Sequence, residues 1–258
     1  MKIGLIGVGA IANYVREALK SRNEMLAAVL VRPSRVREAP ELYVGAVADL
    51  PDDLDLVIDC AGHAALVEHG PAVLLRGFDL LSVSLGALAD PDTYASLEQA
   101  AAKGGARLHL ASGAIGALDC LQAARVGQME SVTYIGRKPP QGWKGSPAED
   151  VTDLDTLVSG EVIHFEGSAR QAALRYPKNA NVAAAVALAG KGFDATQVRL
   201  IADATVTENI HQIEASGDFG RFTFQINGKA MPDNPRSSAL AAMSVLSKLD
   251  QLTRSISL

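Results

Sequence analysis

Features that mark several protein classes are scarce in this sequence of 258 residues. The chain has two cysteines, Cys60 and Cys120, which lie far apart and outside any CxxC spacing. A zinc ribbon or a disulfide-stabilised scaffold therefore does not fit, and the reducing cytoplasm is the expected location. The formal net charge is −5 and no basic run occurs, which argues against nucleic acid or an anionic membrane as a partner.

Signals for membrane insertion, secretion and metal binding are also lacking. The longest apolar stretch near a helix, Val182–Ala189, is too short to cross a bilayer. Met1 and Lys2 lead straight into an apolar segment, without the features of a signal peptide. Histidines and carboxylates are scattered with no metal-ligand spacing, so no metal is expected. With 48% apolar and 21% charged residues, the chain should be a soluble protein with a sizeable core.

The first half alternates between short apolar runs and segments with helical spacing. Glycine- or proline-containing turns separate these segments. Strands that are apolar on both faces are typical of a parallel sheet covered by helices. The runs that predict strands are Lys2–Ile6, Leu26–Val31, Leu54–Cys60, Leu80–Val83 and Arg107–Leu110.

The second half of the chain has a different sequence pattern. A helix is predicted over Asn181–Ala189, and β-type alternation covers Val198–Ala215 and Phe219–Ile226, with a hairpin signal between the two segments. A terminal helix follows Asn234-Pro235. Its apolar stripe is predicted to be Leu240, Met243, Leu246 and Leu249.

These patterns predict an α/β fold of two domains. Residues 1–111 with 233–258 should form a Rossmann domain, a doubly wound parallel sheet that binds a dinucleotide. Residues 112–232 should form an α+β domain with a mostly antiparallel or mixed sheet, which supplies catalysis, substrate binding and oligomerisation.

A GxGxxA motif ends the first predicted strand and opens a helix. Gly7 allows the tight turn, Gly9 lets the backbone approach a pyrophosphate, and Ala12 permits close packing of helix on strand. The first helical residues, Ala10 and Ile11, offer free N–H groups to the phosphates. The alternative is a purely structural glycine turn, but the βα context favours dinucleotide binding.

The residues after the second strand bear on the choice between NAD and NADP. An acidic residue normally binds the adenosine ribose of NAD there, whereas this chain has Val31–Arg35 (VRPSR). Arg32 and its neighbours would attract a 2′-phosphate, so we expect NADP or dual use; the alternative is that they are solvated loop arginines.

After the third long strand, small residues including Ala61 leave room for the nicotinamide end. Cys60 lacks an obvious activating partner for a nucleophile.

Two features of the second half are candidates for the catalytic site. The turn Ser112–Gly116 follows the last strand of the first half, and the alternative is a plain linking turn between domains. His211 shares one strand face with Thr205, Thr207 and Asn209. That polar face either lines a cleft or is a solvated outer face, and His164 is equally ambiguous.

Seven motifs in one order make the chain resemble the L-aspartate dehydrogenase family over nearly its whole length. They are the N-terminal GxGxxA, Ser112–Gly116 (SGAIG), Gly136–Pro140 (GRKPP) with Trp143, Phe165–Arg170 (FEGSAR), Tyr176–Ala183 (YPKNANVA), Asn209–Ile213 (NIHQI) and Asn234–Ser238 (NPRSS). The last motif has Arg236 and Ser237 where Lys and Thr are expected, which keeps the charge and the hydroxyl.

The resemblance implies a reversible oxidative deamination of L-aspartate to oxaloacetate and ammonia through iminoaspartate, with NAD or NADP. It also implies that His211 is the catalytic residue and that Ala114 and Asn181 bind the cofactor. In some organisms the family supplies iminoaspartate to NAD biosynthesis.

The chemistry of that reaction suggests further roles. A histidine can take the proton from the substrate ammonium and activate the water that hydrolyses the imine. Two substrate carboxylates need cationic or hydroxyl partners, for which the candidates are His164, Ser168, Arg170 and Lys178. Lys178 and Ser168 rank slightly above the other two because they lie within the family motifs. The alternative for each is a surface residue or a salt-bridge partner.

Other readings remain open at this stage. A homoserine dehydrogenase or dihydrodipicolinate reductase would share the first domain, although the His-His segment with a nearby Lys expected of the reductase is not visible. A non-catalytic NAD(P)H sensor would usually add a DNA-binding helix or a basic patch. We expect a homodimer formed through the β-rich second half, with a small molecule as the ligand.

Overall fold

The computed structural model describes residues 1–36, 42–177, 181–231 and 234–256, with backbone alone over 234–237. The chain divides into two compact units. The first unit is Met1–Ala111 together with Ala241–Leu258, and the second is Ser112–Leu240.

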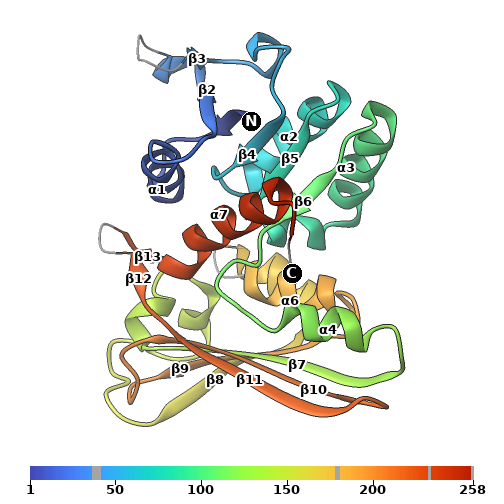
Figure 1. The fold of residues 1–258 in the computed structure, drawn as a ribbon. Coiled ribbons are helices and arrows are strands. Elements are labelled where there is room, and N and C mark those ends of the chain that lie inside the picture. Colours follow the sequence, from blue (N-terminus) through green and yellow to red (C-terminus); the bar gives the residue numbers. More distant parts are fainter. Residues whose placement is uncertain (37–41, 178–180, 232–233, 257–258) are drawn as a thin grey trace. The chain divides into compact units, whose positions relative to one another are not determined.

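The first unit contains a six-stranded parallel sheet in the order β3-β2-β1-β4-β5-β6 (Figure 1). This order is that of a Rossmann fold, so the fold expected from the sequence is confirmed. The side chains of β4 and nearly all those of β1 are buried, which explains why these strands read as apolar on both faces. The strands are β1 (Lys2–Ile6), β2 (Met25–Leu30), β3 (Leu42–Val44), β4 (Leu56–Asp59), β5 (Asp79–Ser82) and β6 (Leu108–Leu110).

Helices cover both faces of this sheet. One face packs on α1 and on the terminal helix α7, in a core that includes Ile3, Leu5, Val15 and Leu249. The other face packs on α2, where a Cβ added at Gly70 would lie 3.5 Å from Leu80 of β5. The helices are α1 (Ala10–Leu19), α2 (His63–Leu75), α3 (Pro91–Gly104) and α7 (Ala239–Thr253), with short 3-10 turns η1 (Pro33–Arg35), η2 (Val47–Asp49) and η3 (Leu85–Ala89).

The buried stripe of α7 differs from the one predicted. The structure buries Ala242, Val245 and Leu249, whereas Met243 is 47% exposed. A strict spacing of three residues drifts around a helix of 3.6 residues per turn, so the predicted stripe could not stay on one face.

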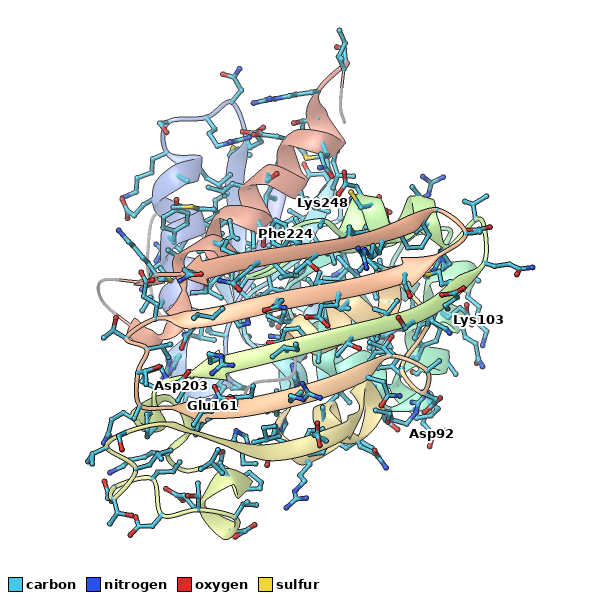
Figure 2. All side chains as sticks on the ribbon, turned by 90° about the horizontal axis from the view of Figure 1, so that it is seen from below. Asp92, Lys103, Glu161, Asp203, Phe224 and Lys248 are labelled. Carbon is cyan, nitrogen blue, oxygen red and sulfur yellow. The ribbon has the colours of Figure 1, made fainter. Side chains whose placement is uncertain are left out.

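The second unit contains a five-stranded mixed sheet in the order β11-β10-β7-β9-β8. The pair β7 and β9 is parallel, and the other three pairs are antiparallel. Figure 1 shows α4 and α6 over one face of this sheet, and Figure 2 shows the opposite face. The strands are β7 (Met129–Lys138), β8 (Glu161–Ser168), β9 (Gln197–Asp203), β10 (Asn209–Gly217) and β11 (Gly220–Gly228), and β12 (Ala230–Met231) pairs separately with β13 (Asn234–Ser238).

Local sequence explains the remaining elements of this unit. The hairpin between β10 and β11 forms where it was predicted, and α6 spans the predicted residues. The predicted strand Val198–Ala215 is instead interrupted over residues 204–208, where Asp203 accepts hydrogen bonds from the backbone and hydroxyl of Thr205. The other elements are α4 (Leu118–Ala124), α5 (Ala169–Arg175), α6 (Asn181–Ala189), η4 (Pro140–Trp143) and η5 (Pro147–Asp150).

Candidate functional site

The first unit has a pocket of about 340 Å³ at the carboxyl edge of its parallel sheet. In a Rossmann fold this edge, at the point where the strand order reverses between β1 and β4, is where dinucleotides bind. Of the residues predicted to bind the cofactor, four line the pocket: Gly7, Gly9, Arg32 and Ala61. Ala10 and Ile11 begin α1 directly after the glycines.

The two glycines of the motif have different physical roles. Gly7 has a φ of +102°, and a Cβ there would lie 2.9 Å from the Cβ of Ala61, so the turn itself requires glycine. Gly9 has a φ of −80°, and a Cβ there would meet nothing within 4 Å. The absent side chain of Gly9 therefore leaves open space beside the N-terminus of α1, where a pyrophosphate fits.

A buried carboxylate fixes the end of β4 beside this pocket. Asp59 is completely buried and accepts hydrogen bonds from the hydroxyls of Ser82 and Ser84, each at 2.7 Å, and from the backbone N–H of Ala61 at 2.9 Å. Burial raises the pKa of Asp59, and these three donors oppose that effect. The neighbouring Cys60 has a pKa raised well above its usual value by burial, so it stays a thiol and is a poor nucleophile.

Arginines lie at the adenosine end of the pocket. Arg32 and Arg35 line it directly after β2. A second pocket of about 400 Å³ shares Arg35 with the first and is also lined by Asn13, Arg16 and Tyr43. This end of the site is therefore cationic, as a phosphate group would require.

In the second unit, His211 lies on β10 with only 5% of its surface exposed. Its Nδ1 is 2.8 Å from the hydroxyl oxygen of Tyr134 on β7, and the two rings stack. The residue opposite His211 in the strand register is Gly136, where a Cβ would come within 2.7 Å of that hydroxyl. Glycine at 136 thus lets Tyr134 reach across the strand pair to the imidazole.

The pKa of His211 is lowered to about 4, first by burial and then by the charge of Lys138. The imidazole is therefore neutral at physiological pH and can accept a proton. Because its Nδ1 faces Tyr134, its Nε2 is the nitrogen left for proton transfer to or from a substrate. Burial raises the pKa of Tyr134, which keeps its hydroxyl protonated beside the histidine.

A second buried histidine lies on the edge strand β8, which β7 and β9 separate from β10. His164 of β8 is 4% exposed, and its Nδ1 is 3.1 Å from the hydroxyl of Tyr176. The indole of Trp143 packs edge-on against His164, with 4.4 Å between ring centroids. The pKa of His164 is also lowered to about 4, by burial, by the charge of Lys138 and by that of Arg175.

Two protein-family models and several relatives match the chain. A family model described as "Aspartate dehydrogenase, C-terminal" matches residues 119–252, and one described as "Homoserine dehydrogenase, NAD binding domain" matches residues 7–111. The L-aspartate dehydrogenase of Ruegeria pomeroyi is 55% identical over 97% of this chain and 92% of its own length. The chain belongs to the L-aspartate dehydrogenase family. A second relative, the L-aspartate dehydrogenase of Cupriavidus necator, is 45% identical over the full length of both chains.

The crystal structure of aspartate dehydrogenase from Thermotoga maritima shares the fold of the family. It covers 100% of this chain and 99% of its own, with a TM-score of 0.81 and 26% identity. Within the described ranges no helix is long and apolar enough to cross a membrane. Among those same residues, no group of three or more His, Cys, Asp or Glu side chains could hold a metal ion.

The other candidate residues predicted from the sequence lie at the following positions. Ala114 is buried in the turn before α4, and Asn181 is the first residue of α6. Ser168 caps α5, because its hydroxyl accepts the backbone N–H of Gln171 while the Gln171 side chain accepts that of Ser168. Lys178 lies outside the described residues. Arg170 forms a two-point ion pair with Asp194.

Sequence reasoning missed several residues of these sites. Tyr134 and Lys138 flank Gly136 on β7 and face His211, but nothing in the local sequence links them to a histidine over 70 residues away. Period-two alternation along β7 was the available signal, since it places residues 134, 136 and 138 on one face. Asp59 was noted only as part of a strand end.

Proposed function

We propose that this chain is an NAD(P)-dependent L-aspartate dehydrogenase. The observation that carries the proposal is the match, at 45–55% identity and 97–100% of the chain, to relatives named for that activity. The Rossmann pocket and the neutral, buried His211 supply the two functions that the reaction needs. L-Aspartate, oxidised cofactor and water would give oxaloacetate, ammonium, reduced cofactor and a proton.

His211 acts as the acid and base in this scheme. The neutral imidazole takes a proton from the substrate ammonium through Nε2, and the electron pair of that N–H bond remains on the substrate nitrogen. A nicotinamide cofactor, when bound, would supply the acceptor for the hydride that leaves Cα. His211 then assists addition of water to the imine and protonation of the departing ammonia. Tyr134 keeps the imidazole oriented throughout these steps.

Several residues would hold the cofactor in this proposal. Gly7, Gly9 and the first N–H groups of α1, which belong to Ala10 and Ile11, would hold the pyrophosphate. Ala61 borders the pocket at the end of β4. Family resemblance adds Ala114 and Asn181 at the nicotinamide end.

We further propose that the enzyme uses both NAD and NADP. Support comes from Arg32 and Arg35 in the pocket and from Arg16, which lines the adjoining pocket with Arg35. An arginine near the ribose accommodates the 2′-phosphate of NADP. Binding of NADPH and NADH to the wild-type protein, followed by cofactor fluorescence, tests this proposal; NADPH affinity at least a hundredfold below that of NADH would contradict it.

The remaining proposals concern the enzyme in the cell. The reaction would run in the cytoplasm, with iminoaspartate available to NAD biosynthesis. A homodimer formed through the five-stranded sheet of the second unit would be the working form, and light scattering during size-exclusion chromatography tests it.

Spectrophotometric turnover tests the central proposal. We expect reduced cofactor to form from L-aspartate with NAD⁺ or NADP⁺, and to be consumed with oxaloacetate and ammonium. L-Homoserine is the matched control substrate, because a homoserine dehydrogenase would share the N-terminal domain. Tight cofactor binding without turnover of L-aspartate would contradict the proposal and favour another substrate or a sensor.

A further inference from the structure

Lys138 lies at the end of β7 on the same strand face as Tyr134 and Gly136. His211 of β10 is opposite Gly136 in the register, so Lys138 is its diagonal neighbour on that face. Diagonal pairs in a sheet are close enough for long side chains to interact. The lysine is therefore placed beside the histidine that we propose as acid and base.

The position of the Lys138 ammonium is set by rigid neighbours. Its Nζ lies 4.7 Å from the ring centre of Trp143, and that indole is 1% exposed and donates a hydrogen bond of 2.9 Å to the carbonyl of Ile201. The alkyl chain of Lys138 passes Gly142, where an added Cβ would lie 3.2 Å from the lysine Cβ. The lysine is thus held along a defined path between Gly142 and the indole.

The same indole connects Lys138 to His164. Trp143 packs on His164, whose Nε2 is buried and has no hydrogen-bond partner among the described residues. A buried polar atom without a hydrogen-bond partner is energetically unfavourable, and it indicates a place where a further polar group can bind. Three basic side chains, Lys138, His164 and His211, thus come from three different strands to one face of the sheet.

Electrostatics within this group disfavour positive charge. Burial lowers the pKa of Lys138 to about 8, and the charge of Lys138 contributes to lowering the pKa of both histidines to about 4. Among the described residues, Tyr134 of β7, Tyr176 and Arg175 also face this cluster and are not anionic at neutral pH, while the charge of Asp150 acts on Tyr176 and not on either histidine. An anion placed here would relieve the repulsion among them.

We propose that Lys138 binds one carboxylate of the substrate, and that this carboxylate, by cancelling the lysine charge, allows His211 to hold the proton it takes from the substrate. The inference rests on the proposed function, because it needs a dicarboxylate substrate and His211 as the base. In the free enzyme a histidinium beside an ammonium is unfavourable, so His211 stays neutral and ready to accept. With the carboxylate bound, the N–H bond formed at Nε2 is stabilised until the proton is passed on.

Binding of succinate tests the first part, because succinate has both carboxylates of the substrate but no amino group to oxidise. Isothermal titration of the enzyme saturated with NAD⁺ should show a Kd about 10- to 100-fold higher in Lys138→Met than in wild type. Lys138→Arg should recover part of the affinity. Lys144→Met is the matched control, since Lys144 is a surface lysine paired with Asp155 and should bind succinate like wild type. A Lys138→Met Kd within about twofold of wild type overturns the proposal.

Proton uptake tests the pairing of the carboxylate with the lysine charge and needs only the wild-type protein. Titrations at pH 8 in two buffers of different ionisation enthalpy should show uptake of up to about half a proton, because Lys138 is half protonated there and the carboxylate raises its pKa. At pH 6 the lysine is already charged, so its uptake should vanish. Equal uptake at the two pH values, or none at pH 8, contradicts the coupling even if the lysine variants fail to fold.

The pKa of His211 distinguishes the proposed role of Lys138 from a purely structural one, because a structural role would leave that pKa unchanged. In Lys138→Met the pKa of His211, followed by NMR, should rise from its value near 4, because one repelling charge is gone. Failure of this proposal is distinct from failure of the proposed function. If the wild type turns over L-aspartate and Lys138→Met binds succinate like the wild type, only the proposed role of Lys138 is contradicted. If the wild type does not turn over L-aspartate, the proposed dehydrogenase function itself is contradicted.

Discussion

At the scale of single residues, Gly7 and Gly9 have different functions although they lie only two positions apart. Gly9 leaves space for a ligand, so Gly9→Val should weaken NADH binding about tenfold or more while the melting temperature changes little. A Cβ at this position meets no protein atom within 4 Å, and the φ of −80° suits any residue. Titration of NADH by fluorescence together with thermal unfolding checks both halves of the expectation.

Gly7→Ala is the matched comparison. Its φ of +102° and the close Cβ of Ala61 should cost about 1–3 kcal/mol of unfolding free energy, measured by denaturant titration. If Gly9→Val bound NADH as tightly as wild type, the pyrophosphate would not pass over Gly9.

At the scale of elements, the strand pair β7 and β10 brings Tyr134 to His211, and β8 brings His164 to Tyr176. The two histidine–tyrosine pairs provide a matched test of which histidine transfers protons. Tyr134→Phe should lower kcat about 10- to 100-fold with little change in KM, because the imidazole loses the contact that orients it. Tyr176→Phe should leave kcat within about twofold, because His164 transfers no proton in the proposed scheme.

Steady-state kinetics in both directions measure these effects, with circular dichroism to establish folding. The opposite result, in which Tyr176→Phe loses kcat and Tyr134→Phe keeps it, would assign the acid and base role to His164.

Elements that depend on the local sequence pattern could be predicted from the sequence. The buried parallel strands read as apolar runs, α6 began and ended as expected, and the turn after Ser216 predicted the β10–β11 hairpin. Each of these depends on residues that are neighbours in sequence. Family motifs also marked His211 before its surroundings were known.

Elements and contacts set by distant parts of the chain were not predictable. The strand β3 has three residues, too few for a periodic signal. It forms because the backbone of β2 is available for pairing at that side of the sheet. The break after β9 depends on Asp203 turning back on Thr205 and binding Arg137, which also pairs with Glu161 at the same end of the sheet (Figure 2). The grouping of Lys138, His164 and His211 depends on the pairing of β7, β8 and β10 in one sheet, which no local sequence pattern indicates.

At the scale of the whole molecule, the N-terminal unit is discontinuous in sequence. Its core includes Val245 and Leu249 of α7, packed with Ile3 and Leu5 of the first strand. The nucleotide-binding unit is therefore complete only when the last helix returns to it. Its stability should depend on residues that no dinucleotide touches.

Two truncations on α7 test this dependence. Leu249→Ala removes a completely buried side chain and should cost about 2–5 kcal/mol of unfolding free energy, because it leaves a cavity in the core shared with β1. Met243→Ala, on the same helix with Met243 47% exposed, should stay within about 0.5 kcal/mol. Denaturant unfolding in the presence and absence of NADH measures both variants. Since NADH binds the folded unit, it should restore stability to Leu249→Ala. Equal effects of the two substitutions would mean that α7 is not part of the N-terminal core.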